Sequence, residues 1–382
     1  MVKLYLIRHG EAEGNLYRQM DGSYDSAITE LGRRQIQALG HRFQDIPLDA
    51  VYSSNLCRAM ETAAVLCRLK KLALHTDPRL REVSVGPWEH QPFGTVAEDY
   101  PEEAQLFSFD PFHWHLDGAE TFQAVAERAV AALTDIVHSH EDQSVAVCTH
   151  GFLIRSILCK LFYGLDHFEL AGKSTNTAVT LLTWEHGTFS LAFKHDASHL
   201  DETLQRLPPY PKDLCIRPMG NQAVEEYIRY RKDAWQVVYG SLRGFDGPGF
   251  WLDAQRTIGS DPAAMVVGYW GTTPVGMIQL NPSRDAEKYV GYIPFLYLRE
   301  PFRHQGLGIQ FIGHAVSFYR KLGRKHLQLS VAPTNKKALG FYNKYGFRQI
   351  RKQRGRFGHL LLMEKDIAPP SPPHDLNIRI LP

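Results

Sequence analysis

The chain has 382 residues, too many for one ordinary hydrophobic core and about right for two domains of average size. Hydrophobic residues make up 44% of it and charged residues 22%, which excludes an intrinsically disordered protein. Residues 1–207 carry 18 lysines and arginines against 28 acidic residues, whereas residues 208–382 carry 25 against 13. This change of sign predicts two modules with different ligands, and a polyanionic ligand is a hypothesis for the basic half.

The sequence argues against a membrane protein and against a disulfide scaffold. No run approaches the ~18 apolar residues that a membrane span needs. Residues 1–8 are too short for a signal-peptide core and lack a cleavage site, so we predict an internal strand there. The five cysteines are an odd number and form no C-x-x-C pair, which disfavours disulfides and a cysteine zinc cluster. We therefore expect a cytoplasmic protein that does not bind membranes.

Two proline-rich stretches divide the chain. Pro208, Pro209 and Pro211 fall within four residues, and such a stretch fits neither a helix nor a central strand. We predict a stiff linker at 206–213 between a first domain at 1–205 and a second at 214–367. A second stretch, 369–373, closes the second domain and leaves a proline-rich tail at 368–382.

The first half alternates predicted strands and helices. Leu4–Ile7 and Val145–Cys148 are continuous apolar runs, as expected of strands buried on both faces. Between them, Thr29–Phe43 and residues 120–138 have apolar residues at helical spacing. This alternation predicts a largely parallel α/β sheet, whose ligands bind beyond the carboxyl ends of the strands.

The second half has a different order of elements. It begins with a predicted helix and a β-hairpin, continues with a strand–helix–strand unit and ends with a pair of strands, which is an α+β arrangement. The predicted elements are a helix at Ala223–Tyr239, hairpin strands at Ala264–Trp270 and Val275–Leu280, a strand at Tyr292–Leu298, a helix at Gly308–Leu322, a strand at His326–Val331 and a helix at Asn335–Tyr345.

Two histidines follow the two buried strands of the first half. Arg8-His9-Gly10 follows the first strand and Thr149-His150-Gly151 follows the other, so both histidines are expected at the same edge of the sheet. A single histidine in such a place is more often a core residue. Two in matching contexts, one beside an arginine, favour a catalytic pair, and each following glycine permits a sharp exit from its strand.

These residues belong to a longer set that resembles the histidine phosphatase superfamily, which includes the cofactor-dependent phosphoglycerate mutases. The resemblance covers residues 1–205 and implies a phosphoglycerate mutase-like three-layer α/β/α sandwich. The matching segments are Leu6–Glu11 with Asn15, Asp25–Gly32, Ser53–Ala63, Leu80–Glu82, Gly86–Glu89 and Thr149–Gly151.

The resemblance implies a role for each residue of the site. His9 is the nucleophile that forms a phosphohistidine with a small-molecule phosphomonoester. Glu82 protonates the leaving oxygen and then deprotonates the attacking water. The phosphoryl oxygens are held by cationic and neutral donors, namely Arg8, Arg58, His150 and Asn15. Because these groups meet the charge, no metal is expected.

The segment after Glu82 favours a phosphatase over a mutase. Mutases of this family carry an adjacent arginine pair there, whereas residues 98–107 hold four acids and no base. Residues 86–89 resemble the small-phosphatase branch, although that branch usually has glycine where this chain has His90. For the aromatic residues Phe107, Phe109, Phe112 and Trp114, packing in the core is favoured over a substrate lid.

A glycine turn marks the second half. Arg303–Gly308 lies between a predicted strand and a predicted helix and leaves backbone N–H groups uncovered at a helix N-terminus, which suits a pyrophosphate. Together with Asn335 and 341–347, this turn resembles the GNAT acetyltransferase signature and implies an acyl-CoA N-acyltransferase fold with acetyl-CoA as co-substrate. The resemblance makes Tyr342 the general acid for the departing thiolate. It assigns cofactor contacts to Leu298, Arg299, Arg303, His304, Gln305, Gly306, Leu307, Gly308 and Asn335.

Other charged residues carry less weight. Lys321, Arg324, Lys325, Lys336 and Lys337 suit the 3′-phosphate of CoA. The basic run Arg348, Arg351, Lys352, Arg354 and Arg356 favours a solvated face, and no nucleic-acid partner is expected. The histidine pairs 113/115 and 195/199 lack clustered acids and are not expected to bind metal.

The sequence therefore predicts a bifunctional enzyme, with a histidine phosphatase joined to an N-acetyltransferase that acts on an amine of unknown identity. Two alternatives stay open. One is phosphomutase activity in the first domain, and the other is a second domain that serves only as a CoA-binding sensor or interaction module.

Overall fold

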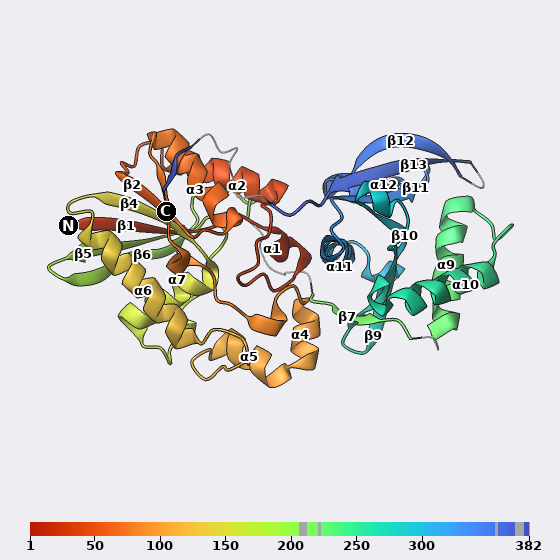
Figure 1. The fold of residues 1–382 in the computed structure, drawn as a ribbon, viewed down its shortest axis with the longest axis horizontal. Coiled ribbons are helices and arrows are strands. Elements are labelled where there is room, and N and C mark those ends of the chain that lie inside the picture. The colour runs from red at the N-terminus through yellow and green to blue at the C-terminus, as the bar shows by residue number, and fades with distance from the viewer. Residues whose placement is uncertain (206–211, 221–222, 356–357, 371–377, 382) are drawn as a thin grey trace. The chain divides into compact units, whose positions relative to one another are not determined.

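The computed structural model describes residues 1–205, 212–220, 223–355, 358–370 and 378–381. Residues 206–211 of the predicted linker (206–213) and residues 371–377 of the predicted proline-rich tail (368–382) lie outside the described residues, as does Arg356. The chain divides into two compact units (Figure 1). The first unit comprises Met1–Gln91, Val96–Tyr210 and Pro370–Pro382, and the second comprises Pro92–Thr95 and Pro211–Pro369.

A mixed sheet forms the centre of the first unit. Its strand order is β14-β3-β2-β4-β1-β5-β6, in which β5 and β6 run antiparallel to their neighbours and the other pairs are parallel. The strands are β1 (Val2–Arg8), β2 (Ala50–Ser53), β3 (Leu74–Thr76), β4 (Ser144–Thr149), β5 (Val179–Glu185), β6 (Thr188–Asp196) and β14 (Ile380–Leu381).

Helices cover both faces of this sheet, with α2 and α3 on one side and α6 and α7 on the other (Figure 1). Apolar side chains of β1, β2, β4 and α3 form a core in which Ile7, Val51, Ala63 and Ala146 are fully buried. The predicted three-layer α/β/α sandwich is confirmed. The helices up to residue 205 are α1 (Glu13–Tyr17), α2 (Glu30–Arg42), α3 (Cys57–Lys70), α4 (Phe93–Asp99), α5 (Pro101–Phe109), α6 (Phe122–His138), α7 (Gly151–Leu158) and α8 (Phe168–Ala171).

Side-chain caps explain where the predicted helices begin. The Thr29 hydroxyl accepts a hydrogen bond from the Gly32 amide at 3.0 Å, so α2 starts one residue later. The Thr121 hydroxyl caps α6 in the same way through Ala124. Both helices therefore start within two residues of their predicted limits.

The short strand β14 was not predicted, because residues 368–382 were expected only to form a proline-rich tail after the second domain. Ile380 pairs in parallel with Leu74 of β3, and the Arg379 carbonyl accepts the Leu74 amide at 2.8 Å. Ile378 packs against the first unit's core. A two-residue pairing leaves no periodic pattern, so only the tertiary structure places this segment in the first unit.

The second unit is built on a sheet of order β12-β13-β11-β10-β9-β8-β7, in which β10 and β11 are parallel and every other pair is antiparallel. The predicted α+β arrangement is confirmed. The strands are β7 (Cys215–Pro218), β8 (Met265–Trp270), β9 (Thr273–Asn281), β10 (Val290–Leu298), β11 (His326–Val331), β12 (Arg348–Gly355) and β13 (Gly358–Asp366).

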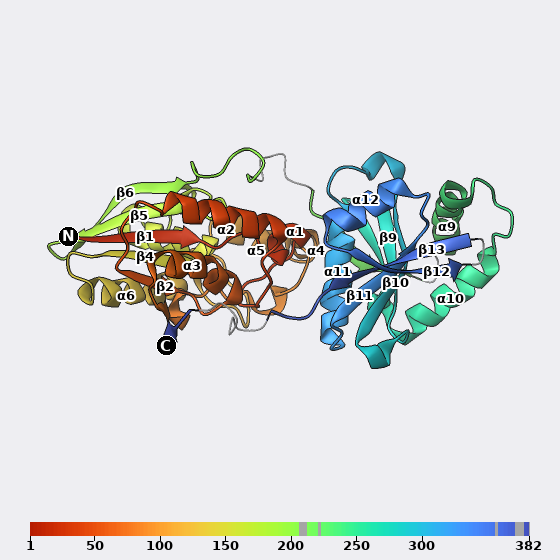
Figure 2. The ribbon, with the colours of Figure 1, turned by 90° about the horizontal axis from the view of Figure 1, so that it is seen from above.

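In the described part of the chain, the α-helices that flank this second sheet are α9 (Val224–Tyr239), α10 (Gly247–Ser260), α11 (Gly308–Lys321) and α12 (Lys336–Lys344). Tyr227 and Tyr230 of α9 pack with Phe295 and Tyr297 of β10 on one face. On the opposite face α11 comes so close that a Cβ on Gly291 would lie 2.3 Å from the Tyr319 ring. Figure 2 shows α11 and α12 on one side of the strands, and α9 and α10 on the other.

Candidate active sites

The register of the first sheet brings the two histidines together. β1 and β4 are parallel neighbours, and Arg8 lies opposite Thr149, so His9 and His150 leave the sheet at the same edge. Their ring centroids are 5.2 Å apart. This is the juxtaposition that the two strand ends predicted.

The glycines after the histidines serve close packing, and neither has a left-handed backbone. A Cβ on Gly10 would lie 2.9 Å from Ile36 of α2, and a Cβ on Gly151 would lie 3.2 Å from the Arg8 side chain. The prediction that these glycines permit a sharp exit from the strand is therefore replaced by a steric reason. A side chain on Gly10 would crowd Ile36 and the Gly32 carbonyl of α2, whereas one on Gly151 would require a small shift of the Arg8 side chain.

The geometry of His9 leaves one ring nitrogen available for attack. Its Nδ1 lies 2.7 Å from the Gly10 carbonyl, which can only accept, so Nδ1 carries the proton in the neutral ring. Burial first, and then the cations Arg58 and Arg8, hold the pKa of His9 well below its ordinary value. His9 is therefore a neutral imidazole whose Nε2 has a free lone pair.

Arg58 is held rigidly beside the histidines. Its side chain is buried, and its two terminal nitrogens donate to the carbonyls of Tyr24 at 2.6 Å and Gly22 at 2.8 Å. The Thr62 hydroxyl joins this group to the nucleophile, because it donates to the Arg58 carbonyl and accepts the Gly10 amide. Thr62 was not singled out in the sequence, since a threonine inside a helix carries no signal of this kind.

His150 has hydrogen-bonding capacity that no described residue uses. Both of its ring nitrogens are buried and have no partner among the described residues. Burial and the neighbouring charges, Arg58 foremost, hold the pKa of His150 well below its ordinary value. A neutral, buried ring with two unused nitrogens is suited to a polar ligand such as a phosphoryl oxygen.

Asn15 and Asn176 lie beside the nucleophile. The Asn176 amide donates to the His9 carbonyl at 3.0 Å and to the Asn15 Oδ1 at 3.2 Å. Arg8 donates to the carbonyl of Ser174 on the same loop. Asn176, which sequence reasoning missed, therefore connects the predicted donors Asn15 and Arg8 through one loop.

Glu82 lies at the N-terminus of the helix that follows His150. Its carboxylate oxygens accept the backbone amides of Phe152 at 3.1 Å and Leu153 at 3.0 Å, the first turn of α7. The positive end of the helix dipole favours a carboxylate there. The structure thus brings Glu82 to the same edge of the sheet as the two histidines.

Two residues near this site behave differently from their family pattern or from expectation. His90, where the resemblance implies glycine, has a left-handed backbone with φ of 66°, a conformation that glycine adopts without strain, and its ring packs on Tyr24. Of the aromatic stretch, Trp114 is buried and Phe107 stacks on Phe152, but Phe109 is 71% exposed. Core packing therefore holds for Trp114 and is wrong for Phe109.

In the second unit, two parallel strands separate. β10 and β11 pair only from Val290/His326 to Ile293/Leu329, although both continue further. Pro294 follows at once and has no N–H to donate, so the ladder ends there. Beyond it, β10 keeps β9 as a neighbour, and no described strand pairs with its other edge, which suits the extended arm of CoA.

The residues after β10 form the predicted turn. Gly306 has φ of 73°, and the Arg303 side chain donates to the Leu298 carbonyl at 2.8 Å. The Arg299 amide already donates to Val275, so of the predicted pair at 298–299 only Leu298 has its amide away from β9. The turn leads directly into α11, whose first amides are available to an anion.

The next helix approaches this turn. Phe341 lies close to Gly308, because a Cβ there would be 3.2 Å from the Phe341 ring. The adjacent Tyr342 is buried, and burial raises its pKa above the ordinary value, so its phenol keeps its proton. The Asn335 oxygen accepts the Ala338 amide and caps α12. Asn335 was predicted only to contact the cofactor. In the structure its side chain also caps α12.

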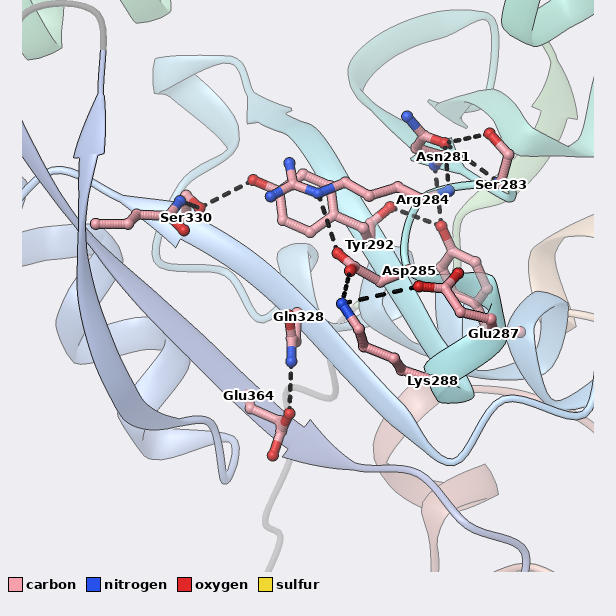
Figure 3. A network of polar contacts seen from close by, with 12 residues as sticks. Asn281, Ser283, Arg284, Asp285, Glu287, Lys288, Tyr292, Gln328, Ser330 and Glu364 are labelled. Carbon is pink, nitrogen blue, oxygen red and sulfur yellow. Dashed lines mark hydrogen bonds and ion pairs between the residues drawn. The ribbon is translucent and has the colours of Figure 1, made fainter.

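A polar network at the point where β10 and β11 separate was missed in the sequence (Figure 3). The Tyr292 hydroxyl donates to Ser330 at 2.9 Å, and the Arg284 guanidinium lies 3.6 Å from the centroid of the Tyr292 ring. Tyr292 is also a neighbour that acts electrostatically on Tyr342. These residues come from separate elements and share no motif, so only the fold brings them together.

Of the basic residues considered for CoA, Arg324 donates to the carbonyls of Ala286 and Pro282 and so holds a loop. No helix in the described part of the chain has the length and apolarity to span a bilayer. Within those same residues, no three His, Cys, Asp or Glu side chains gather in a way that suits a metal ion.

Comparison with known proteins matches both halves of the chain to families. Residues 4–197 match the histidine phosphatase superfamily (branch 1), and residues 225–347 match the acetyltransferase (GNAT) family. The solved structure of Bacillus stearothermophilus YhfR is 34% identical, with a TM-score of 0.51, over 52% of this chain and 99% of that protein.

Two curated relatives align with the first half. Phosphoserine phosphatase 1 of Hydrogenobacter thermophilus is 31% identical over 44% of this chain and 78% of its own length. Phosphoglycerate mutase-like protein 4 of Arabidopsis thaliana is 30% identical over 53% of this chain and 88% of its own length. With paired histidines at one sheet edge and a glycine turn after a separated strand, the chain belongs to the histidine phosphatase superfamily and carries a second domain of the GNAT acetyltransferase family.

Proposed function

We propose that the chain is a bifunctional enzyme that hydrolyses a small phosphomonoester and transfers the acetyl group of acetyl-CoA to an amine. The observation that carries the first activity is the neutral His9, whose Nδ1 is committed to the Gly10 carbonyl. The unused nitrogens of His150 and the neighbouring Arg8 and Arg58 complete a site for a phosphoryl group. Two relatives are named phosphoserine phosphatase and phosphoglycerate mutase-like protein, and phosphoserine and phosphoglycerate are both phosphomonoesters.

Hydrolysis takes two displacements at phosphorus. The Nε2 of His9 attacks, the bond from phosphorus to the leaving oxygen breaks, and Glu82 gives that oxygen a proton. Water then attacks the phosphohistidine, Glu82 takes the proton of the water, and the P–N bond breaks to release phosphate. Arg8 and Arg58 stabilise the charge on the phosphoryl oxygens in both steps, which makes a metal unnecessary.

Hydrolysis is expected to exceed isomerisation. Residues 98–107 hold four acids and no base, so no cation there pairs with the carboxylate of a sugar acid. The purified protein, with a chelator present, is expected to release phosphate from a nitrophenyl phosphate and to leave 3-phosphoglycerate unconverted. Phosphate release and the 2-phosphoglycerate product are both measured. Rapid interconversion of the two phosphoglycerates would establish the mutase alternative, and loss of hydrolysis with the chelator would contradict metal independence.

For the second domain, the open edge of β10 and the turn at 303–308 support acetyl-CoA binding. When bound, acetyl-CoA supplies an acetyl thioester for attack by an amine. The backbone amides after Gly306 would hold the pyrophosphate, and the Leu298 amide, on the side of β10 away from β9, would bind the pantetheine arm. Tyr342, with its raised pKa, holds a proton for the departing sulfur.

Replacing Tyr342 by phenylalanine is expected to lower transfer and spare binding. The change removes only the hydroxyl, so the rate of thiol release falls about 10- to 100-fold, while the dissociation constant of acetyl-CoA stays within about twofold. Calorimetry gives the binding constant and thiol release with a panel of amines gives the rate. Tyr345→Phe, directly after the same helix, is the matched control, because it also removes only a hydroxyl and the Tyr345 ring packs on Phe341.

Two other outcomes would be informative. Equal transfer by Tyr342→Phe and the parent would remove Tyr342 from the mechanism. Binding of acetyl-CoA without thiol release by the parent, across the whole panel of amines, would favour the alternative of a CoA-binding sensor.

A further inference from the structure

The segment that carries Glu82 has little regular structure of its own. A single turn of 3-10 helix, Pro78–Leu80, precedes it, and residues 81–85 belong to no helix or strand. The first amides of α7 bind the Glu82 carboxylate, whereas the backbone of the segment is held by groups outside it. One side chain on α6 binds three of its carbonyls.

Arg128 spans three carbonyls of the segment. Its Nη1 donates to the carbonyls of Arg79 at 2.6 Å and Arg81 at 2.8 Å, and its Nη2 donates to the carbonyl of Glu82 at 3.2 Å. The same guanidinium forms a two-pronged pair with Glu120, with N···O distances of 2.6 and 2.8 Å. The planar fork of arginine is what permits all of these bonds at once.

Glu120 closes the other side of the same segment. Its backbone amide donates to the Ser84 carbonyl at 2.8 Å, and its Oε2 accepts the Ser84 amide at 3.4 Å. Glu82 thus lies between Arg79, Arg81 and Ser84, each of which is tied to the Glu120–Arg128 pair. The pair is partly buried, with 21% of Arg128 and 23% of Glu120 exposed, so solvent screens it less than a surface ion pair.

We propose that Arg128, fixed by Glu120, is a positioning residue for phosphomonoester hydrolysis that holds the Glu82 carboxylate at the leaving oxygen. The inference rests on the proposed phosphatase function and assigns no contact between Arg128 and the substrate. Arg128 also acts at a distance on the second histidine, because its charge is among those that lower the pKa of His150.

If Arg128 positions Glu82, its replacement affects substrates differently according to their leaving groups. A nitrophenolate departs without help from an acid, whereas an alkoxide needs the proton of Glu82. A lysine at position 128 keeps the charge but cannot span three carbonyls and a carboxylate. Displacement of Glu82 in such a variant slows the first step for the alkyl phosphate. It also slows water attack in the second step for both substrates.

The test compares kcat/KM, which reports the first step, for a nitrophenyl phosphate and an alkyl phosphate in the parent and in Arg128→Lys. We expect kcat/KM to fall by about 30-fold or more for the alkyl phosphate and by less than about threefold for the nitrophenyl phosphate. Slower water attack also leads to an initial burst of nitrophenol and accumulation of phosphohistidine.

Arg79→Lys is the matched control. Arg79 lies on the same segment, but its guanidinium pairs with Asp77 and Asp135, and its side chain is 41% exposed. We expect Arg79→Lys to keep both kcat/KM values within about twofold. Glu120→Gln removes the charge and keeps the shape, and is expected to give the Arg128→Lys pattern with smaller amplitude. If Arg128→Lys does not fold, the kcat/KM values of Glu120→Gln test the positioning role instead.

Three results would overturn the positioning role. These are equal losses for the two substrates in the folded variants, no loss for either, or the same pattern in Arg79→Lys. Failure of the parent protein to hydrolyse either substrate would instead contradict the proposed phosphatase function, so the two failures are distinguishable.

Discussion

Replacing His9 by alanine is expected to lower hydrolysis of a nitrophenyl phosphate by at least about 10³-fold, because the change removes the side-chain atom proposed to bond to phosphorus. The fall should be independent of substrate, since every leaving group passes through the same first step. Initial rates of phosphate release measure it. Radiolabelled substrate should leave an acid-labile phosphate on the parent protein and none on the variant.

His113→Ala provides the matched control for this result. His113 is exposed and pairs with Asp110 on the surface, so its removal should leave the rate unchanged. Full turnover in His9→Ala, or the labelled phosphate on an alkali-labile serine or threonine ester, would show that another residue is the nucleophile.

Replacing Gly306 by glutamate is expected to weaken acetyl-CoA binding by at least about 100-fold. Its φ of 73° lies in the left-handed region, so any side chain strains the turn. The carboxylate also adds a negative charge where the pyrophosphate is expected, at the start of α11. Calorimetric titration with acetyl-CoA measures the change in dissociation constant.

Gly323→Glu is the matched control, because it introduces the same strain and the same charge away from the proposed pyrophosphate site. Gly323 has φ of 69°, and a Cβ there meets nothing within 4 Å. It follows the far end of α11, about 20 Å from Gly306 along the helix axis. We expect Gly323→Glu to bind acetyl-CoA like the parent, and both variants to keep their hydrolysis of nitrophenyl phosphate. Binding by Gly306→Glu equal to that of the parent would remove the turn from the cofactor site.

The elements that the sequence predicted are those whose apolar pattern is long or whose ends carry polar caps. β1, β4, α6 and α11 are of this kind, and their observed bounds differ from prediction by a few residues. The helix α10 was missed because Gly247, Pro248 and Gly249 argue against a helix. Proline is tolerated in a first turn, and the Asp246 side chain caps it through the Gly249 amide.

The residues of the candidate site also fall into a predicted group and a missed group. Residues that follow strands, such as His9 and His150, were predicted because the end of a parallel strand has a fixed place in the fold. Residues that act through distant backbone groups were not, because Arg128 and Thr62 look like ordinary helix residues in the sequence. Their partners lie 46 or more positions away, at Glu82 for Arg128 and at Gly10 for Thr62, and only the folded chain makes these pairs.

The pairing of β14 with β3 has a consequence for the synthesis of the protein on the ribosome. Leu381 lies 305 positions after Thr76, whose hydroxyl donates to its carbonyl. At roughly 5–20 residues per second, translation of that stretch takes about 15–60 s. During this interval β3 has emerged without its outer neighbour and leaves an unpaired edge that other chains can join. The sheet of the first domain is therefore incomplete until the whole second domain has been made, and the unpaired edge of β3 is accessible to other chains during that period.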